Sequence, residues 1–290
     1  MSFESQLAAS IEQLHPQQDL CHIPFDGLYL FRSSSPLARK PIVYTPSICV
    51  IAQGKKKLFI ENSQFTYDTD NYLINSVTMP VEAEVELPDP DTPYLGLSLE
   101  IDSYLVSQLL IEMEQQEPNP DSQKPSDIIS ASPVTDRLHN CFIRLLDCQN
   151  SEMDKRILVP NLIREIYYEV LKGPHGKMLR NCVSNHNGAN RIAPVVHYIE
   201  NNFHQALDIE TIARFAGMSS STLHEHFKQV TSMSPMKFVK SLRLHRAHSL
   251  LLSGSLASEA SYSVGYSSPS QFSREFKRFF GETPKSIQSL

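Results

Sequence analysis

The chain has 290 residues, of which 41% are hydrophobic and 20% are charged, and its formal net charge is −6. This length exceeds what one hydrophobic core usually organises, so two domains are expected. No run approaches the roughly 18 apolar residues of a transmembrane helix, and the first residues lack the basic and apolar regions of a signal peptide, which predicts a cytoplasmic protein without a membrane partner.

The cysteines are Cys21, Cys49, Cys141, Cys148 and Cys182. Their number is odd and no two are separated by only two residues, so neither a disulfide framework nor a zinc cluster is expected. We interpret them as reduced structural or surface thiols. The alternative is a redox- or electrophile-sensing thiol, which would need an electropositive setting to become a thiolate.

Short β-rich runs separated by turn-forming residues fill the region from Ile23 to about Leu99. Several short strands at close spacing predict a small antiparallel sandwich or barrel. The predicted strands are Leu28–Arg32, Ile48–Gln53, Lys57–Glu61, Phe65–Tyr67, Tyr72–Val77 and Tyr94–Ile101.

A Pro-, Gln- and Asp-rich break at Gln115–Pro125 follows the strands, and two helices are then predicted at Val134–Leu146 and Ile157–Leu171. The second helix carries an apolar stripe at every fourth position, made of Leu158, Leu162, Ile166 and Val170. Such a stripe packs against either the barrel or a dimer partner, and the pattern leaves both open.

The polar run Asn181–Arg191 lacks apolar periodicity and predicts a linker. Residues 191–290 carry 11 Lys and Arg against 7 Asp and Glu, although the whole chain carries 26 against 32. A basic module on an acidic chain indicates that nucleic-acid affinity is confined to the C-terminal region.

Two segments of this region, which start at Leu207 and Leu256, follow one plan. Each predicts a short helix, a turn at a glycine and a second helix that begins after a serine. The turn glycines, Gly217 and Gly265, lie 48 residues apart, so the chain repeats one supersecondary unit. Glycine suits this turn because the backbone leaves the first helix with positive φ. The last hundred residues therefore predict two helix-turn-helix units.

The second helix of each unit has an inward and an outward face. Leu223 and Phe227 in the first unit, and Phe272 and Phe276 in the second, are four residues apart and predict a buried stripe. Ser219 or Ser220 would cap the first of these helices, and Ser268 with Pro269 the second. The outward residues are the candidates for DNA contact.

One amphipathic helix is predicted between the units, opened by Ser234 and Pro235 and closed by Gly254. Some eighteen residues span roughly 27 Å, and with the flanking turns the two units could reach successive major grooves, about 34 Å apart. Arg243 and Arg246 on this helix are interpreted as either a solvated face or an internal ion pair.

Several motifs of the region carry a family resemblance. They are A-G-M-S at Ala216–Ser219, S-P at Ser234-Pro235, L-R-L-x-R-A at Leu242–Ala247, V-G-Y-S-S at Val264–Ser268, F-S-R-E-F-K-R at Phe272–Arg278 and G-x-T-P at Gly281–Pro284. With this spacing the region resembles the DNA-binding module of the AraC/XylS family of bacterial transcription regulators. The resemblance implies an all-α domain of seven helices, which start near Ile192, Ile209, Ser221, Pro235, Leu256, Pro269 and Pro284.

The same resemblance implies which residues meet DNA. Base-reading positions fall on Ser221, Thr222, His224 and Glu225 in the first unit, and on Ser270, Gln271, Ser273 and Arg274 in the second. Arg274 is the strongest candidate because arginine bidentate to guanine is the commonest specific contact. The phosphate partners are Lys228, Lys277 and Arg278. The second unit departs from the family at Ala257, Ala260 and Ser261, where branched aliphatic residues are usual, which predicts a thinner core there.

The N-terminal region is similar to one branch of this family, through the runs at Tyr44–Lys56, Tyr72–Val77, Pro93–Leu97 and Arg164–Gly176. The resemblance implies an α+β chain with a cupin-like regulatory and dimerisation domain at residues 1–180, a linker at 181–191 and the DNA-binding domain at 192–290. It implies a transcription activator without a cofactor, whose partners are double-stranded DNA, RNA polymerase, a small-molecule effector and a second copy of the chain.

Three alternatives remain beside this interpretation. A cupin-type metal enzyme needs converging histidine and carboxylate ligands, but Tyr44–Ile101 has no histidine, and His15 and His22 are interpreted as surface residues outside the strands. A fusion to a DNA-repair domain would need clustered cysteines that the isolated Cys49 does not supply. A constitutive DNA-binding regulator, whose barrel only dimerises, is compatible with every pattern above.

Overall fold

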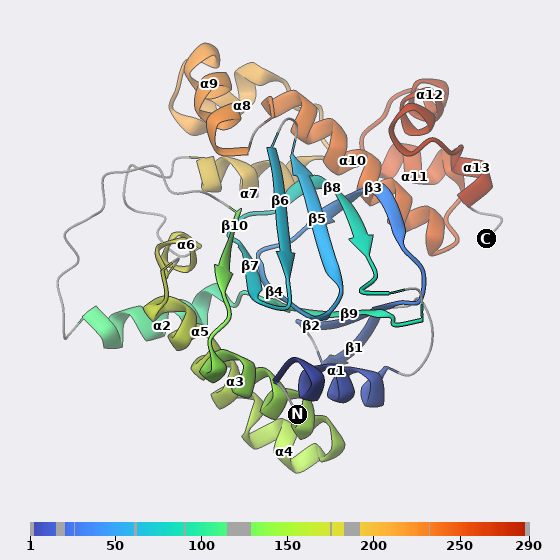
Figure 1. Cartoon of the computed structure of the whole chain (residues 1–290). Coiled ribbons are helices and arrows are strands. Elements are labelled where there is room, and N and C mark those ends of the chain that lie inside the picture. Colours follow the sequence, from blue (N-terminus) through green and yellow to red (C-terminus); the bar gives the residue numbers. More distant parts are fainter. Residues whose placement is uncertain are drawn as a thin grey trace.

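The computed structural model describes residues 3–15, 21–25, 27–60, 63–89, 91–114, 129–174, 176–182, 192–231 and 233–287. A β-barrel lies at the centre, helices of the first two thirds of the chain cover one of its sides, and the C-terminal helices lie across one end (Figure 1). The α+β architecture is thus confirmed. The predicted break at Gln115–Pro125 and most of the predicted linker lie outside the described residues.

The barrel consists of two antiparallel sheets. The six-stranded sheet has the order β1-β2-β9-β4-β7-β10, and the four-stranded sheet has the order β3-β8-β5-β6. The strands are β1 Cys21–Phe25, β2 Leu28–Ser33, β3 Leu37–Tyr44, β4 Ser47–Gln53, β5 Lys55–Ile60, β6 Ser63–Asp68, β7 Asn71–Asn75, β8 Met79–Glu86, β9 Tyr94–Glu100 and β10 Ile129–Pro133. Six of them match predicted strands, whereas β1, β3, β8 and β10 were not predicted.

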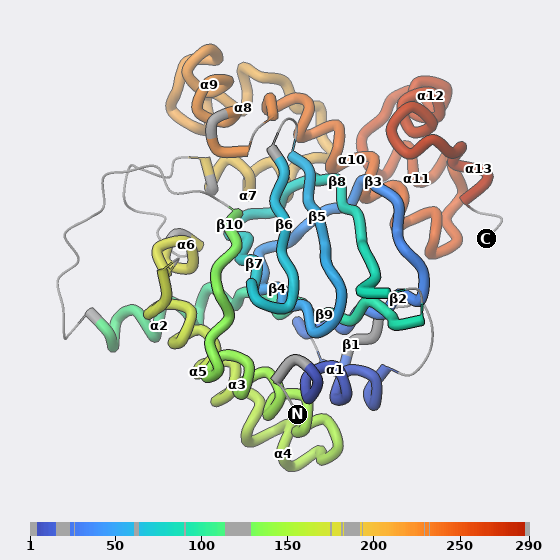
Figure 2. Tube along the Cα trace, viewed as in Figure 1, coloured from blue at the N-terminus to red at the C-terminus, as the bar shows by residue number. Residues whose placement is uncertain are grey.

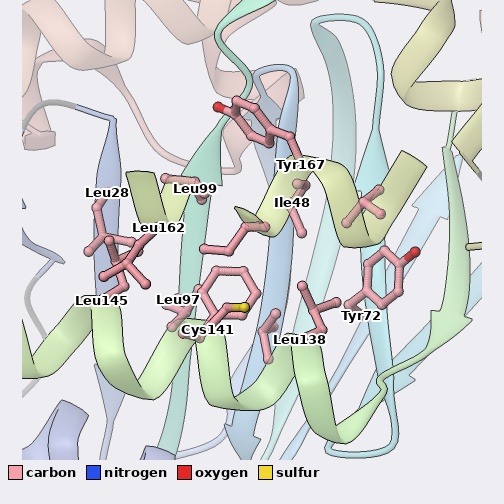
Figure 3. Close-up of a cluster of buried hydrophobic side chains, with 14 of the residues drawn as sticks. Leu28, Ile48, Tyr72, Leu97, Leu99, Leu138, Cys141, Leu145, Leu162 and Tyr167 are labelled. Carbon is pink, nitrogen blue, oxygen red and sulfur yellow. The ribbon is translucent and has the colours of Figure 1, made fainter. Parts of the chain in front are cut away.

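Alternation along the strands gives the six-stranded sheet two buried faces. On β4, Ile48 and Val50 join a core outside the barrel, while Cys49 and Ile51 join a core inside it. The outer core fills the space between the sheet and the helices that cover it, and Figure 3 shows side chains of both meeting there. This explains why β4 is a continuous apolar run, since a strand that is buried on both faces needs no polar side.

The helices of the N-terminal region are α1 Phe3–Leu14, α2 Ser103–Glu114, α3 Asp136–Asp147, α4 Glu152–Ile157, α5 Val159–Lys172 and α6 Gly176–Asn181, with a short 3₁₀ turn at Cys148–Asn150. The predicted helix Ile157–Leu171 corresponds to α5, which starts two residues later, and α4 was not predicted. Leu162, Ile166 and Val170 of its stripe are buried in the outer core, so they pack within the chain, whereas Leu158 at the break is 43% exposed.

Two expectations about histidines were wrong. His15 is only 5% exposed because it directly follows α1, whose apolar residues pack into the outer core. His22 belongs to strand β1 rather than to a segment outside the strands. Among the described residues, no group of three His, Cys, Asp or Glu side chains could hold a metal ion.

The described thiols are free, and Cys49, Cys141 and Cys148 are buried. Burial raises the pKa of Cys141 and of Cys182 to about 12, and it also raises the pKa of Cys148. These three groups therefore stay protonated thiols at neutral pH, which favours the structural interpretation over sensing.

The C-terminal helices are α7 Ile192–Asn202, α8 Ile209–Ala216, α9 Ser220–Thr231, α10 Pro235–Leu252, α11 Ala257–Ser263, α12 Pro269–Phe280 and α13 Pro284–Ile287. Their starts agree to within one residue with those that the family resemblance implied, and a capping residue or a proline marks several of them. In the described part of the chain no helix is both long and apolar enough to cross a membrane.

Two cores hold these helices, and they differ in extent. The core of the first unit, around Phe227 and Phe238, is continuous with the inner core of the barrel. The second unit has a separate, smaller core around Phe272 and Phe276. The long helix α10 runs between the units (Figure 2) and also contacts β3 and β8 of the barrel.

Candidate functional site

The first helix-turn-helix unit consists of α8, a tight turn and α9. Asp208 caps α8 by accepting a hydrogen bond from the Thr211 amide at 2.8 Å. Gly217 then takes φ +62°, the left-handed conformation that only glycine adopts without strain, and its amide bonds back to the end of α8. Ser219 accepts the Thr222 amide at 3.2 Å, so Ser219 rather than Ser220 caps α9.

The second unit repeats this geometry with α11 and α12. Gly265 takes φ +88° after α11, and Ser268 accepts the Gln271 amide at 3.4 Å to cap α12, with Pro269 in its first turn. Gly281, at φ +81°, ends the helix. The turn glycines and the serine caps of the two predicted units are therefore in the predicted places.

Both second helices turn their apolar stripe inward. Leu223, Phe227, Phe272 and Phe276 are fully buried. The outward candidates Ser221, His224, Glu225, Ser270, Gln271, Ser273 and Arg274 are exposed, as are Lys228, Lys277 and Arg278. Thr222 is half-buried, and its hydroxyl lies 2.8 Å from that of Ser219. The structure thus gathers each set of predicted site residues on one face of one helix.

The two outward faces differ in charge. Glu225 stands beside His224 and Lys228 on α9, so that face is mixed. On α12 the acidic residue, Glu275, turns inward and pairs with Lys240 of α10 at 3.0 Å. The exposed face of α12 therefore carries Arg274, Lys277 and Arg278, and among the described residues no carboxylate lies within ion-pair distance of these three side chains. Such a face favours a polyanion.

Glu275 is held ionised by its surroundings. Partial burial would raise its pKa, but hydrogen bonds from Lys240, Tyr266 and Gln271 lower the pKa below its ordinary value. Tyr266 donates its hydroxyl to Glu275 at 2.9 Å, and Gln271 donates its amide at 3.3 Å. The carboxylate is thus occupied inside the unit and leaves the outer face of α12 to the cations.

The expectation for Arg243 was wrong, because it belongs neither to a solvated face nor to an ion pair. Its Nε donates to the Phe203 carbonyl at 2.7 Å and its Nη2 donates to the Gln205 carbonyl at 2.6 Å. Arg246, three residues on, is exposed. Both arginines belong to the L-R-L-x-R-A motif at Leu242–Ala247. The motif does not tell which of them faces inward, because that depends on the rotation of α10 about its axis.

A second candidate site lies inside the barrel. Lys56 on β5 points inward with Leu58 and Ile60, whereas its neighbour Lys57 points outward to Glu84 and Glu86. The Lys56 ammonium lies 5.1 Å from the Tyr44 ring centre and 5.7 Å from that of Phe31. Burial lowers the pKa of Lys56, and the nearby Cys49 opposes this shift without cancelling it. Within the described residues no carboxylate lies within ion-pair distance of it.

The walls around Lys56 are aromatic and carry hydroxyl groups. The Tyr44 and Tyr67 hydroxyls are 2.9 Å apart, and burial raises the pKa of both phenols well above the ordinary value. The Tyr94 ring folds over Gly96, where any Cβ would lie 2.8 Å from the Tyr94 hydroxyl. Gly96 belongs to the run Pro93–Leu97, one of those that carry the resemblance of the N-terminal region. This indicates that the run shapes the barrel interior.

Comparisons with known proteins bear on the whole chain. Residues 24–178 match the family model for the AraC-type transcriptional regulator N-terminus, and residues 212–289 match a helix-turn-helix domain model. Crystal structures of ToxT from Vibrio cholerae share the fold over both regions. One has a TM-score of 0.61 at 11% identity and covers 94% of this chain and 99% of that chain. Another has a TM-score of 0.59 at 12% identity and covers 90% and 93%.

Curated relatives match the C-terminal part of the chain. The HTH-type transcriptional activator RhaS of Escherichia fergusonii is 32% identical over 99 residues, which are 34% of this chain and 36% of RhaS. Histidine kinase P4 of Formosa agariphila is 34% identical over 91 residues, which are 31% of this chain and 7% of that protein. The match thus spans little more than a third of the length of RhaS and 7% of that of the kinase. Because the N-terminal model alone matches more than half of the chain, the protein belongs to the AraC family of DNA-binding transcription regulators.

Proposed function

We propose that the protein controls transcription by placing α9 and α12 in successive major grooves of one DNA site. The observation that carries this proposal is the pair of exposed faces, one on each second helix, behind which the aromatic stripes are fully buried. The distance supports it, since α10 has 18 residues and spans roughly 27 Å between the units. Residues 192–290 are the DNA-binding domain in this proposal, residues 1–180 the regulatory domain, and residues 181–191 the linker.

Within this interface the residues divide by role. Ser221, Thr222, His224, Glu225, Ser270, Gln271, Ser273 and Arg274 read base edges, and Lys228, Lys277 and Arg278 contact phosphates. Phosphate contacts set the position of the protein and base contacts set its sequence preference. The protein would act in the cytoplasm as an activator, which is how RhaS is named, and in this proposal it would recruit RNA polymerase to a promoter.

Selection from a random duplex pool by the full-length chain tests this function. We expect enrichment of a two-part sequence, bound at least about a thousandfold more tightly than random DNA at the same salt concentration. Equal affinity for the enriched and the random DNA would contradict sequence-specific regulation. A fusion of the enriched site to a reporter promoter then separates activation from repression.

We further propose that the barrel responds to a small organic anion held by Lys56. An ammonium inside the barrel without a carboxylate partner is costly, and an anionic ligand would supply the missing charge. One of the ToxT structures contains an unsaturated fatty acid, which is an amphiphile of this charge type. The rival function is constitutive DNA binding with a barrel that senses nothing.

A thermal-shift series on the full-length chain distinguishes the two. The probes are carboxylates from benzoate to long-chain fatty acids, each beside the alcohol of the same skeleton. We expect at least one carboxylate to raise Tm and its alcohol not to, and we expect Lys56→Met to abolish the shift. Lys57→Met is the matched control, because Lys57 lies on the same strand but pairs outside the barrel. A Tm unmoved by every probe would favour constitutive binding, whereas a shift retained in Lys56→Met would refute the assignment of the anion to Lys56.

A second copy of the chain is the remaining partner in the proposal. Tyr104 and Ile111 on α2 are 69% and 63% exposed, and Tyr168 on α5 is 40% exposed. Because α2 contacts α5, these exposed side chains lie on adjoining helices, and we propose this pair of helices as the dimerisation surface. Sedimentation equilibrium of the wild type and of Ile111→Glu tests it, and a wild type that is monomeric at all concentrations would refute it.

A further inference from the structure

The two turn glycines are equivalent in sequence but not in surroundings. A Cβ at Gly217 would meet nothing within 4 Å. A Cβ at Gly265 would lie 2.5 Å from the carbonyl oxygen of His204 and 2.9 Å from its carbonyl carbon. Gly217 is thus needed only for its backbone conformation. Gly265 is needed also because the loop between α7 and α8, which leads into the first unit, lies directly on the turn of the second.

Arg243 also holds that loop. Its guanidinium donates to the carbonyls on both sides of His204, those of Phe203 and Gln205, at 2.7 Å and 2.6 Å. The same group lies 6.0 Å from the ring centre of Tyr266, the residue after Gly265. A planar fork with two carbonyl acceptors fixes an orientation, which a single flexible donor would not do.

Arg243 lies at the point of α10 where the core of one unit gives way to the core of the other. Leu242, the residue before it, belongs to the core of the first unit, and Leu244, the residue after it, belongs to the core of the second. Phe203, whose carbonyl it binds, packs against both cores. Arg243 therefore stands where the two units meet.

We propose that Arg243, the Phe203–Gln205 loop and Gly265 form a clamp that fixes the distance and angle between α9 and α12. The clamp makes the spacing between the two contacted DNA segments a determinant of specificity, in addition to the bases read. Arg243 is a positioning residue, and it acts without touching DNA. This inference rests on the proposed DNA-binding function and names the part of the chain that sets its geometry.

The experiment uses the full-length chain and duplexes derived from its selected site, with one base pair inserted or deleted between the two segments. One base pair rotates the second segment by about a tenth of a turn, so we expect the wild type to lose about tenfold in affinity. Arg243→Ala should reduce this loss to about threefold or less, because a loosened second unit can follow its groove. Gly265→Ala should act in the same direction by pushing the loop away.

Gly217→Ala is the matched control. It strains the turn of the first unit but displaces no neighbour, so it should lower stability while the penalty for altered spacing stays at the wild-type value. Arg243→Lys, which keeps the charge and loses the fork, replaces Arg243→Ala if that variant does not fold. A wild-type spacing penalty in both Gly265→Ala and the folded Arg243 variant would overturn the clamp. Failure to select any site would instead refute the proposed function and is therefore distinguishable.

Discussion

The first and second helix-turn-helix units repeat one plan, yet they are stabilised in different ways. The core of the first unit continues into the barrel, whereas the second has its own small core in which rings of α12 pack against His245 and His248 of α10. The small residues of α11 contribute little volume there, as Ala260 and Ser261 are fully buried. The exposed face of α9 is mixed in charge and that of α12 is cationic.

This difference indicates a division of roles. A change inside the barrel can reach the first unit through a continuous apolar core, since closely packed interiors transmit displacement. Within the described residues, the second unit is reached through α10, through the clamp and through the barrel contacts of α10 and α12. We infer that the first unit is the one coupled to the regulatory domain and that the second contributes more of the electrostatic affinity.

The largest expected effect comes from removing one ring in each core. Phe227→Ala and Phe272→Ala should each lower the free energy of unfolding by about 3–5 kcal/mol, because both side chains are fully buried. Phe227→Ala should also lower the hydrogen-exchange protection of backbone amides in the strands that line the inner core of the barrel. Phe272→Ala should leave that protection unchanged. Equal loss of barrel protection in the two variants would break the comparison.

The next effect concerns base reading. Arg274→Ala should cost about 1–3 kcal/mol of binding, confined to one base pair of the selected site. His224→Ala, at an exposed place on the first face, should cost less because an imidazole cannot make the two parallel hydrogen bonds of a guanidinium. Lys277→Ala is the control, as it should weaken binding to all sequences and reduce the salt slope by about one. Equal losses on selected and random DNA for Arg274→Ala would contradict its assignment.

Acid should weaken the second unit selectively. Burial, with a smaller effect of His248, lowers the pKa of His245 from 6.5 to about 3. The folded state therefore favours the neutral imidazole of His245. The free energy of unfolding keeps its full value above pH 6.5 and decreases as the pH falls below 6.5. At pH 5.5 the loss is roughly 1.4 kcal/mol.

His245→Phe keeps a ring against Phe279 and Phe280 and should remove that part of the pH dependence. Urea unfolding of the wild type and of the variant at pH 5.5 and 7.5 measures it. His224→Phe, at an exposed place in the first unit, should leave the pH dependence unchanged. The same slope in the wild type and in His245→Phe would refute the account.

The smallest effect contrasts two buried hydroxyls. The Ser261 hydroxyl in the second unit has no hydrogen-bond partner among the described residues, so Ser261→Ala should stabilise the protein by about 1 kcal/mol. Thr231 in the first unit donates to the Phe227 and Met233 carbonyls, and Thr231→Val should destabilise it by a similar amount. Thermal unfolding measures the change in Tm of each variant. Changes of the same sign in Ser261→Ala and Thr231→Val would contradict the comparison.

Sequence was informative where the determinants are local. The helix starts at Pro235, Pro269 and Pro284 were predictable because a proline in the first turn, with a capping serine where one is present, marks a start without any tertiary contact. Strand β8 was also predictable in principle, since Val81, Ala83 and Val85 alternate with glutamates. Strand β3 was not, because it carries Arg39, Lys40 and Pro41 at an edge of its sheet.

The features that distinguish the sites depend on packing over long sequence separations. Nothing in the run Lys55-Lys56-Lys57 says which lysine enters the barrel, because strand register decides it. Gly217 and Gly265 are indistinguishable until the loop at His204 is placed. Predicted outward faces were correct as faces, while their contacts with DNA remain proposals.

A footprint of the full-length chain on its selected duplex tests the central claim most directly. Two unequal units held at a fixed spacing predict two protected segments on one DNA face, about one helical turn apart, in every selected duplex. A single protected segment, or two segments whose separation varies from duplex to duplex, would contradict the account.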